Sequence, residues 1–213
     1  LGDVYKRQVL VLISFGGKMQ SQCEHKVWRE TASDAANRLT TATVNEFLEF
    51  CKVPRPGFHT EKALAYFQAY ADKHGFKHYR DNYGNFWMDV PATEGYENYP
   101  KVILQAHMDM VCVCTSDKDI DFKTTGITAI INGDRMTADG TSLGADNGIG
   151  VAAGLAVATS DAPHGPLRCL FTADEDVGLH GAAALDPAAL DSEFLINIDL
   201  EDCLLYTSDA ADD

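Results

Sequence analysis

One histidine and five carboxylates occur at four places in the chain where their chemistry could be combined. They are His107 and Asp109 in VILQAHMDM, Asp146 in LGADNGIG, Glu175 and Asp176 in LFTADEDVG, and Asp199 in FLINIDLED. Imidazole nitrogen and carboxylate oxygen are ligands that suit zinc, and a carboxylate that binds no metal can act as a general base. These residue types therefore indicate a divalent-metal hydrolase.

The sequence also predicts the elements that must position these side chains. Three of the four sites follow apolar runs typical of buried strands, at 102–105, 167–172 and 194–198, and the fourth begins a helix of small residues. Open α/β sheets bind ligands where strands end and helices begin, along one edge of the sheet. We therefore predict that the metal-binding side chains converge within bridging reach of one another, namely His107, Asp146, Asp176 and Asp199.

Two helices are expected before the first of these sites. Helical periodicity covers 44–51 and is stopped by a Pro-Arg-Pro-Gly turn at 54–57. A second helix at 60–73 has Glu61 in its first turn and Gly75 as its C-cap.

Strands and helices alternate along the remainder of the chain. Two strands joined by a turn are expected in 76–89, and an Asn-Gly pair predicts a β-hairpin in 127–138. Helices at 147–159 and near 179–185 complete a β-α-β-α-β order with the apolar strands. This order predicts an α/β sheet with helices on both faces.

Each site taken alone has an ordinary structural alternative. Asp109 shares a strand face with His107 and can orient its imidazole, but a satisfied polar pair at a strand end has the same pattern. Asp146 fits a helix N-cap, and its glycine-rich loop lacks the lysine of a phosphate-binding loop. The acidic run from Asp174 to Asp176 fits a solvated turn, although carboxylates beside a buried strand repel one another and a dication relieves that repulsion. The four sites together favour the metal centre.

The bulk composition disfavours several classes of partner. A formal net charge of −15 over 213 residues argues against nucleic acid and anionic membrane surfaces, which would repel the chain. The apolar run at 9–15 is too short to cross a bilayer. The six cysteines form no regular disulfide framework, and Cys112 and Cys114 lack the second pair of a zinc ribbon. We therefore expect a cytoplasmic protein with unpaired thiols.

The two ends of the chain differ from the rest. Residues 1–18 and 203–213 fit neither helix nor strand periodicity and resemble translated adapter or leader sequence, so we expect Met19 to be the native first residue. Residues 19–202 are then expected to be a partial catalytic domain whose native sequence continues further.

Longer segments carry a specific family resemblance, from about residue 43 to residue 202. QAHMDMV, TADGTSLGADNGIGVA, LFTADEDVGLHGAAALDP and FLINIDLED resemble the co-catalytic zinc metallopeptidases of the aminoacylase and carboxypeptidase type, particularly their aminoacyl-histidine dipeptidase branch. The earlier CKVPRPGFHTEKALAYF and RDNYGNFWM share this resemblance. It implies a three-layer α/β/α catalytic domain with a mixed central sheet, truncated before the lid domain of the family.

The resemblance implies a set of metal ligands. His107 and Asp199 would bind one zinc, Asp176 would bind a second, and Asp146 would bridge the two, with a cis peptide bond between Asp146 and Asn147. The implied cofactors are two Zn²⁺ ions, with Mn²⁺ and Co²⁺ as alternatives.

The resemblance also implies the catalytic groups, and the chain departs from the family pattern at two points. Glu175 would be the general base for a metal-bridging water, and Asp109 would orient His107. The family usually has Glu where this chain has Asp176. The last metal-binding histidine of the family lies far downstream, and none of the seven histidines here takes its place.

The activity implied is zinc-dependent hydrolysis of dipeptides, with a small peptide as substrate. Two alternatives use the same scaffold, an N-acyl amino acid deacylase and a tripeptidase, and a third is an inactive metal-binding fragment. The lid domain would supply the contacts of a homodimer in the full-length enzyme.

Overall fold

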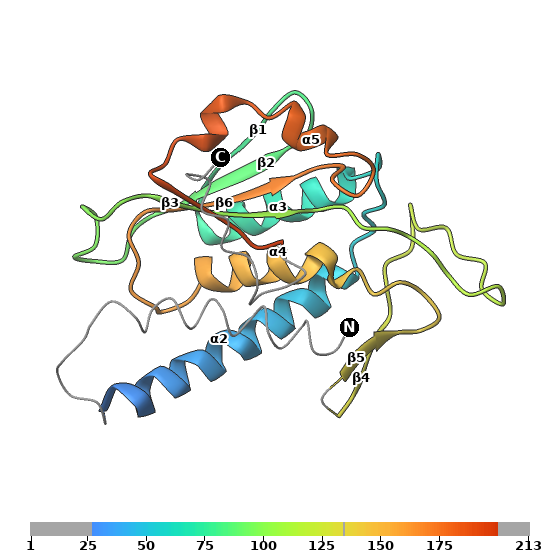
Figure 1. Ribbon diagram of the computed structural model, residues 1–213, viewed down its shortest axis with the longest axis horizontal. Coiled ribbons are helices and arrows are strands. Elements are labelled where there is room, and N and C mark those ends of the chain that lie inside the picture. The colour runs from blue at the N-terminus through green and yellow to red at the C-terminus, as the bar shows by residue number, and fades with distance from the viewer. Residues whose placement is uncertain (1–26, 134, 200–213) are drawn as a thin grey trace, which may run out of the picture.

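A computed structural model describes residues 27–133 and 135–199 and contains a five-stranded sheet in the order β1-β2-β6-β3-β7 (Figure 1). Its strands are β1 (Lys77–Arg80), β2 (Phe86–Val90), β3 (Val102–His107), β6 (Leu167–Thr172) and β7 (Phe194–Asn197). Strand β3 is parallel to both β6 and β7, whereas β2 is antiparallel to β1 and β6. The predicted mixed sheet is therefore confirmed.

Helices cover both faces of this sheet. The larger core lies between the sheet and helices α3 (Glu61–His74) and α4 (Ala145–Ala158). A smaller core on the other face joins the sheet to the segment with α5 (His180–Ala183) and the 3-10 helix η1 (Pro187–Leu190). This arrangement confirms the predicted layers, with the thinner layer formed by short helices.

Helix α3 follows from its apolar spacing and its ends. Its buried side chains recur at intervals of one helical turn and are Ala63, Leu64, Phe67, Tyr70 and Ala71. The helix ends at Gly75, which takes a left-handed conformation with φ of 71° and satisfies the last carbonyls. Both the helix and its glycine cap were predicted from the sequence.

Helix α4 is buried on nearly all sides because it lies between the sheet and helix α2 (Val27–Cys51) (Figure 1). Its glycine and alanine residues allow both neighbours to approach closely. The predicted helix of small residues therefore becomes the central layer that connects α2 to the sheet.

The predicted hairpin forms a separate two-stranded sheet of β4 (Ala129–Asn132) and β5 (Arg135–Ala138). Met136 and Ala138 pack in a second core with Phe47 of α2 and Ile149 of α4. The hairpin is thereby held beside the start of α4.

Two expectations about elements were wrong in extent or burial. The helix expected at 44–51 begins far earlier, at Val27, because a polar and threonine-rich stretch continues it. The strand expected to be buried at 194–198 is exposed, with Phe194, Leu195 and Ile196 at 59%, 47% and 44%. Among the described residues β7 has a neighbour on one side only, so its apolar residues lack a covering layer.

Several other expectations concern residues outside those described. These are the non-native leader at 1–18, the start at Met19, and the tail at 203–213. Among the described helices, none is both long and apolar enough to cross a membrane.

The parallel register aligns the ends of three strands. His107 at the end of β3 pairs with Thr172 at the end of β6, and Gln105 pairs with Asn197 of β7. The Ile198 amide donates to the Gln105 carbonyl at 2.8 Å, which continues this register toward Asp199. The segments that follow β6 and β7 therefore begin beside His107.

We predict that Phe67→Ala destabilises the fold far more than Phe194→Ala. Phe67 is fully buried and stacks on Phe171 with ring centroids 4.3 Å apart. Removal of such a side chain typically costs about 3–5 kcal/mol, whereas Phe194 is 59% exposed. Urea unfolding of both variants measures the difference, and equal losses would contradict the placement of the core.

Candidate metal centre

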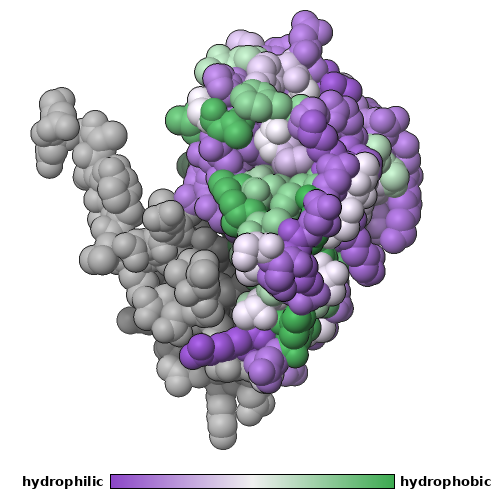
Figure 2. Space-filling model, turned by 90° about the vertical axis from the view of Figure 1, so that its right-hand side faces the viewer, coloured by the Kyte–Doolittle hydropathy of each residue, from purple (hydrophilic) through white to green (hydrophobic). Residues whose placement is uncertain are grey.

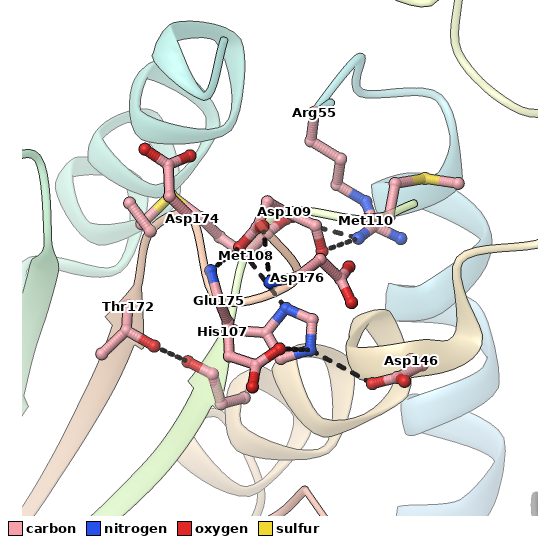
Figure 3. A network of polar contacts seen from close by, with 12 residues as sticks. Arg55, His107, Met108, Asp109, Met110, Asp146, Thr172, Asp174, Glu175 and Asp176 are labelled. Atoms are coloured by element: carbon pink, nitrogen blue, oxygen red, sulfur yellow. Dashed lines mark hydrogen bonds and ion pairs between the residues drawn. The ribbon is translucent and has the colours of Figure 1, made fainter. Parts of the chain in front are cut away.

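A buried imidazole lies at the centre of the acidic cluster (Figure 3). His107 Nε2 lies 3.1 Å from Asp146 Oδ1, 3.7 Å from Glu175 Oε2 and 3.8 Å from Asp199 Oδ2. These carboxylates come from three separate segments, the start of α4 and the ends of β6 and β7. The structure therefore brings together residues that the sequence places up to 92 positions apart, from 107 to 199.

Asp109 connects this imidazole to the acidic loop after β6. Its carboxylate is fully buried and lies 3.4 Å from His107 Nδ1. The same carboxylate accepts hydrogen bonds from the backbone amides of Glu175 at 3.0 Å and Asp176 at 3.2 Å. Asp109 therefore contacts the ring as expected and also fixes the loop that carries two other site residues, which the sequence did not reveal.

Asp174, the first acid of that loop, is turned away from His107 (Figure 3). It has a φ of 55° and its carboxylate accepts bonds from the Phe58 amide at 2.7 Å and the Tyr83 hydroxyl at 2.9 Å. The solvated-turn alternative is therefore wrong for Asp174, because this residue is buried and anchors the loop to two other segments.

Asn85 is a second anchor of the same loop that sequence reasoning missed. It is fully buried, donates to the Gly181 carbonyl at 2.8 Å and accepts from the Ala173 amide at 3.0 Å. Its signals in the sequence are its place directly after a predicted turn and within the segment RDNYGNFWM, and neither assigns it this role.

Asp146 lies at an irregular start of α4. The helix has Gly144 as its N-cap, with φ of 67°, and no side-chain capping bond. Asp146 itself has non-helical φ and ψ, and the peptide bond between Asp146 and Asn147 is cis, as the resemblance implied. The N-cap interpretation is therefore wrong, and the Asp146 carboxylate is directed to His107 instead.

Crowding shifts the ionisation of the cluster. Burial lowers the pKa of His107, but contacts with Asp109, Asp146 and Asp199 outweigh burial and raise it to about 10. Burial raises the pKa of Asp199 to about 6, and the Asp146 and Glu175 carboxylates contribute in the same direction. Without a cation other than the imidazolium, these carboxylates repel one another.

The donor set fits a divalent metal. His107, Asp146 and Asp199 form one group whose ligand atoms lie within 4.8 Å of one another, and His107, Asp109 and Asp176 form another. Asp176 Oδ2 is buried, and the described residues offer it no hydrogen-bond partner. Burial raises the pKa of Asp176, and Asp109 and Asp146 add to this. A dication would satisfy such an oxygen and relieve the repulsion.

The group of His107, Asp146 and Asp199 contains the residues expected for one zinc and its bridging ligand. The other group differs from the expected second zinc site. Asp176 was expected to share a metal with Asp146, and in the structure it is grouped with His107 and Asp109. Among the described residues, no third His, Cys, Asp or Glu joins Asp146 and Asp176 in such a group.

A cavity of about 640 Å³ adjoins the cluster. Asp146 and Asp176 line it together with hairpin residues such as Met136 and Ala138 and with Leu143. Because Met136, Ala138 and Leu143 are apolar, the cavity has an apolar wall next to the two carboxylates. Among the coloured residues, the face shown in Figure 2 is largely hydrophilic, with apolar patches between the polar side chains.

We predict that zinc binding at pH 7 releases protons. His107 must give up the proton that it holds in the metal-free site, where its pKa is about 10. Affinity should therefore rise with pH, by about tenfold per pH unit for each proton released, until that pKa is reached. Calorimetry in buffers of different ionisation enthalpy counts the protons, and zinc binding without proton release would contradict a protonated His107 in the metal-free site.

Comparison with known proteins supports a peptidase relationship, although no family model matches the chain. Over 157 residues it is 43% identical to the cytosol non-specific dipeptidase of Escherichia coli (strain K12). The aligned region covers 73% of this chain and 32% of that protein. The crystal structure of aminoacylhistidine dipeptidase from Vibrio alginolyticus matches with a TM-score of 0.72 and 42% identity, over 75% of this chain and 33% of that one.

A tripeptidase from Staphylococcus aureus matches with a TM-score of 0.63 and 25% identity, over 75% of this chain and 43% of that one. The chain thus spans about a third of the length of the two dipeptidases. These matches confirm the resemblance found in the sequence: the chain is similar in sequence to the cytosol non-specific dipeptidase and in both sequence and fold to the aminoacylhistidine dipeptidase, over about a third of each.

Proposed function

We propose that the complete protein hydrolyses dipeptides of the aminoacyl-histidine type at a centre of two zinc ions. The observation that carries the proposal is the convergence of three carboxylates on Nε2 of the buried His107, at 3.1, 3.7 and 3.8 Å. The names of the relatives, two dipeptidases and a tripeptidase, support hydrolysis of a peptide bond.

The proposed ligands are His107 and Asp199 for one ion, Asp176 for the other, and Asp146 for both. A divalent ion in this place would supply Lewis acidity, which polarises a peptide carbonyl and makes water more acidic. The Asp109 carboxylate lies 3.4 Å from Nδ1 of His107, so Nε2 is the nitrogen that faces the other carboxylates. This ring orientation supports the ligand assignment.

Glu175 is the proposed general base. Its side chain is 30% exposed, so its carboxylate is accessible to water, and its backbone amide is held by Asp109 at 3.0 Å. It would accept a proton from the attacking water as the new C–O bond forms, and donate that proton to the leaving amine as the C–N bond breaks. One carboxylate thus serves as base and then as acid.

The cavity beside Asp146 and Asp176 is the proposed place for the substrate side chain. Tripeptide hydrolysis is the second candidate, because the Staphylococcus aureus tripeptidase also matches the chain. Comparison of kcat/KM for aminoacyl-histidine dipeptides, tripeptides and N-acyl amino acids separates these activities. We also propose a cytosolic location, as the name of the Escherichia coli relative states for that protein, and a homodimer formed outside the described residues.

We predict that Glu175→Gln in the complete enzyme keeps its zinc but loses activity by about 10²- to 10⁴-fold. The amide can still hydrogen-bond water but cannot accept its proton. Zinc content and kcat are measured on the same preparation. Turnover close to that of the unaltered enzyme, with zinc bound, would assign the base to another group.

We predict that the 213-residue chain alone binds one zinc with moderate affinity and has little dipeptidase activity. His107, Asp146 and Asp199 supply three ligands for one ion, but Asp146 and Asp176 fall short of the three protein ligands usual for a second. Elemental analysis with a β-alanyl-histidine assay tests this. Two tightly held zinc ions with robust turnover would show that the chain contains every ligand it needs.

A further inference from the structure

A buried arginine joins the two segments that carry the candidate ligands. Arg55 is 1% exposed. Its Nη1 donates to the Met108 carbonyl at 3.3 Å and the Asp109 carbonyl at 3.1 Å (Figure 3). Its Nη2 donates to the Gly144 carbonyl at 2.6 Å. The first two carbonyls directly follow His107, and the third lies two residues before Asp146. One guanidinium therefore spans both sides of the cluster.

The glycine-rich loop has the shape needed to admit this guanidinium. A Cβ atom on Gly144 would lie 2.5 Å from Arg55 Nη2, and one on Gly148 would lie 2.6 Å from the same atom. Both distances are far below van der Waals contact. These two glycines therefore make room for Arg55, which gives a physical reason for the glycine-rich loop other than phosphate binding.

Arg55 is itself held rigidly. Its carbonyl accepts a bond from the Met110 amide at 3.1 Å, and its guanidinium lies over the Phe50 ring at 4.5 Å. Burial lowers the pKa of Arg55 to about 10, partly offset by Cys51, Cys112, Asp109 and Asp176. The side chain is thus a cation at neutral pH.

The Arg55 guanidinium donates through Nη1 and Nη2 to backbone carbonyl oxygens, although the Asp109 and Asp176 carboxylates lie close by, and its Nε has no partner among the described residues. A buried charge is costly unless its environment compensates it. An apolar side chain would fill the same space without that cost, but it would donate no hydrogen bond to the three carbonyls. Space filling alone therefore does not account for an arginine here, whereas its donors between the two ligand segments do.

We propose that Arg55 is a positioning residue of the metal centre, which sets the separation between the His107–Asp109 segment and the Gly144–Asp146 segment. This inference rests on the proposed metal-binding function. It assigns the Pro-Arg-Pro-Gly turn a role in metal affinity through backbone geometry, without contact between Arg55 and the metal or the substrate.

The test measures zinc affinity per folded molecule for Arg55→Met and for a matched control, Arg168→Met. Arg168 is also buried, at 5% exposure, donates to the Ala188 and Ala189 carbonyls and lies over Trp87, but it pairs with Asp89 away from the cluster. Both changes should lower stability. Arg55→Met alone should weaken zinc binding, by about 10- to 100-fold, as loss of residues that orient metal ligands typically does.

Arg55→Lys provides a second variant because it keeps the charge but loses the planar fork that reaches both segments. It should fold more readily than the methionine variant and still weaken zinc binding. The inference would be overturned if a folded Arg55→Lys or Arg55→Met variant kept unaltered zinc affinity. It would also be overturned if Arg168→Met lost as much zinc affinity as Arg55→Met. Absence of zinc binding by the unaltered chain would instead contradict the proposed metal centre.

If neither Arg55 variant folds, hydrogen exchange of the unaltered chain, measured by NMR, decides. Zinc should slow exchange of the Arg55 guanidinium protons, which donate to the Met108, Asp109 and Gly144 carbonyls, more than exchange of the Arg168 guanidinium protons, which donate to the Ala188 and Ala189 carbonyls. Exchange of the Arg55 guanidinium protons that zinc leaves unchanged would overturn the inference.

Discussion

The crowding of negative charge around one buried imidazole is the constraint on which the rest of this structure depends. Asp109 lies against Nδ1 of His107, while Asp146, Glu175 and Asp199 lie against Nε2. These neighbours stabilise the imidazolium, whereas burial and the Asp146 and Glu175 carboxylates raise the pKa of Asp199 against the opposing effect of His107. A site of this kind is more stable with added positive charge, which is the physical basis for expecting a metal there.

The surrounding fold supplies the means to hold such a cluster together. The parallel register of β3 with β6 and β7 delivers three strand ends to one place. Asp109 then fixes the loop after β6 through two backbone amides. Asp174 and Asn85 attach the same loop to more distant segments. The geometry of the candidate ligands therefore rests on several bonds to the backbone and not on the ligand side chains alone.

The exposed strand β7 shows where the described residues leave the fold open. Three consecutive large apolar side chains, Phe194, Leu195 and Ile196, are each more than two-fifths exposed. Asp199 directly follows this strand region and belongs to the first group of candidate ligands. Its position therefore depends on the least covered strand of the sheet.

The sequence by itself determined most of the helices and strands and the residue types of the candidate site. The glycine cap of α3, the Asn-Gly hairpin and the apolar runs of β3 and β6 were predicted because their signals lie within a few residues of one another. The convergence of His107, Asp146 and Asp199 also followed from strand ends and a helix start. The functional roles of these residues remain predictions.

Only the tertiary structure decided which acids face the imidazole and what holds them. It turned Asp174 away, grouped Asp176 with Asp109, and placed Arg55 between two segments 53 and 89 residues distant in the chain. It also left β7 exposed where its composition indicated burial. The physical reason is that these outcomes depend on packing between segments distant in sequence, whereas periodicity and turn chemistry report only on neighbours along the chain.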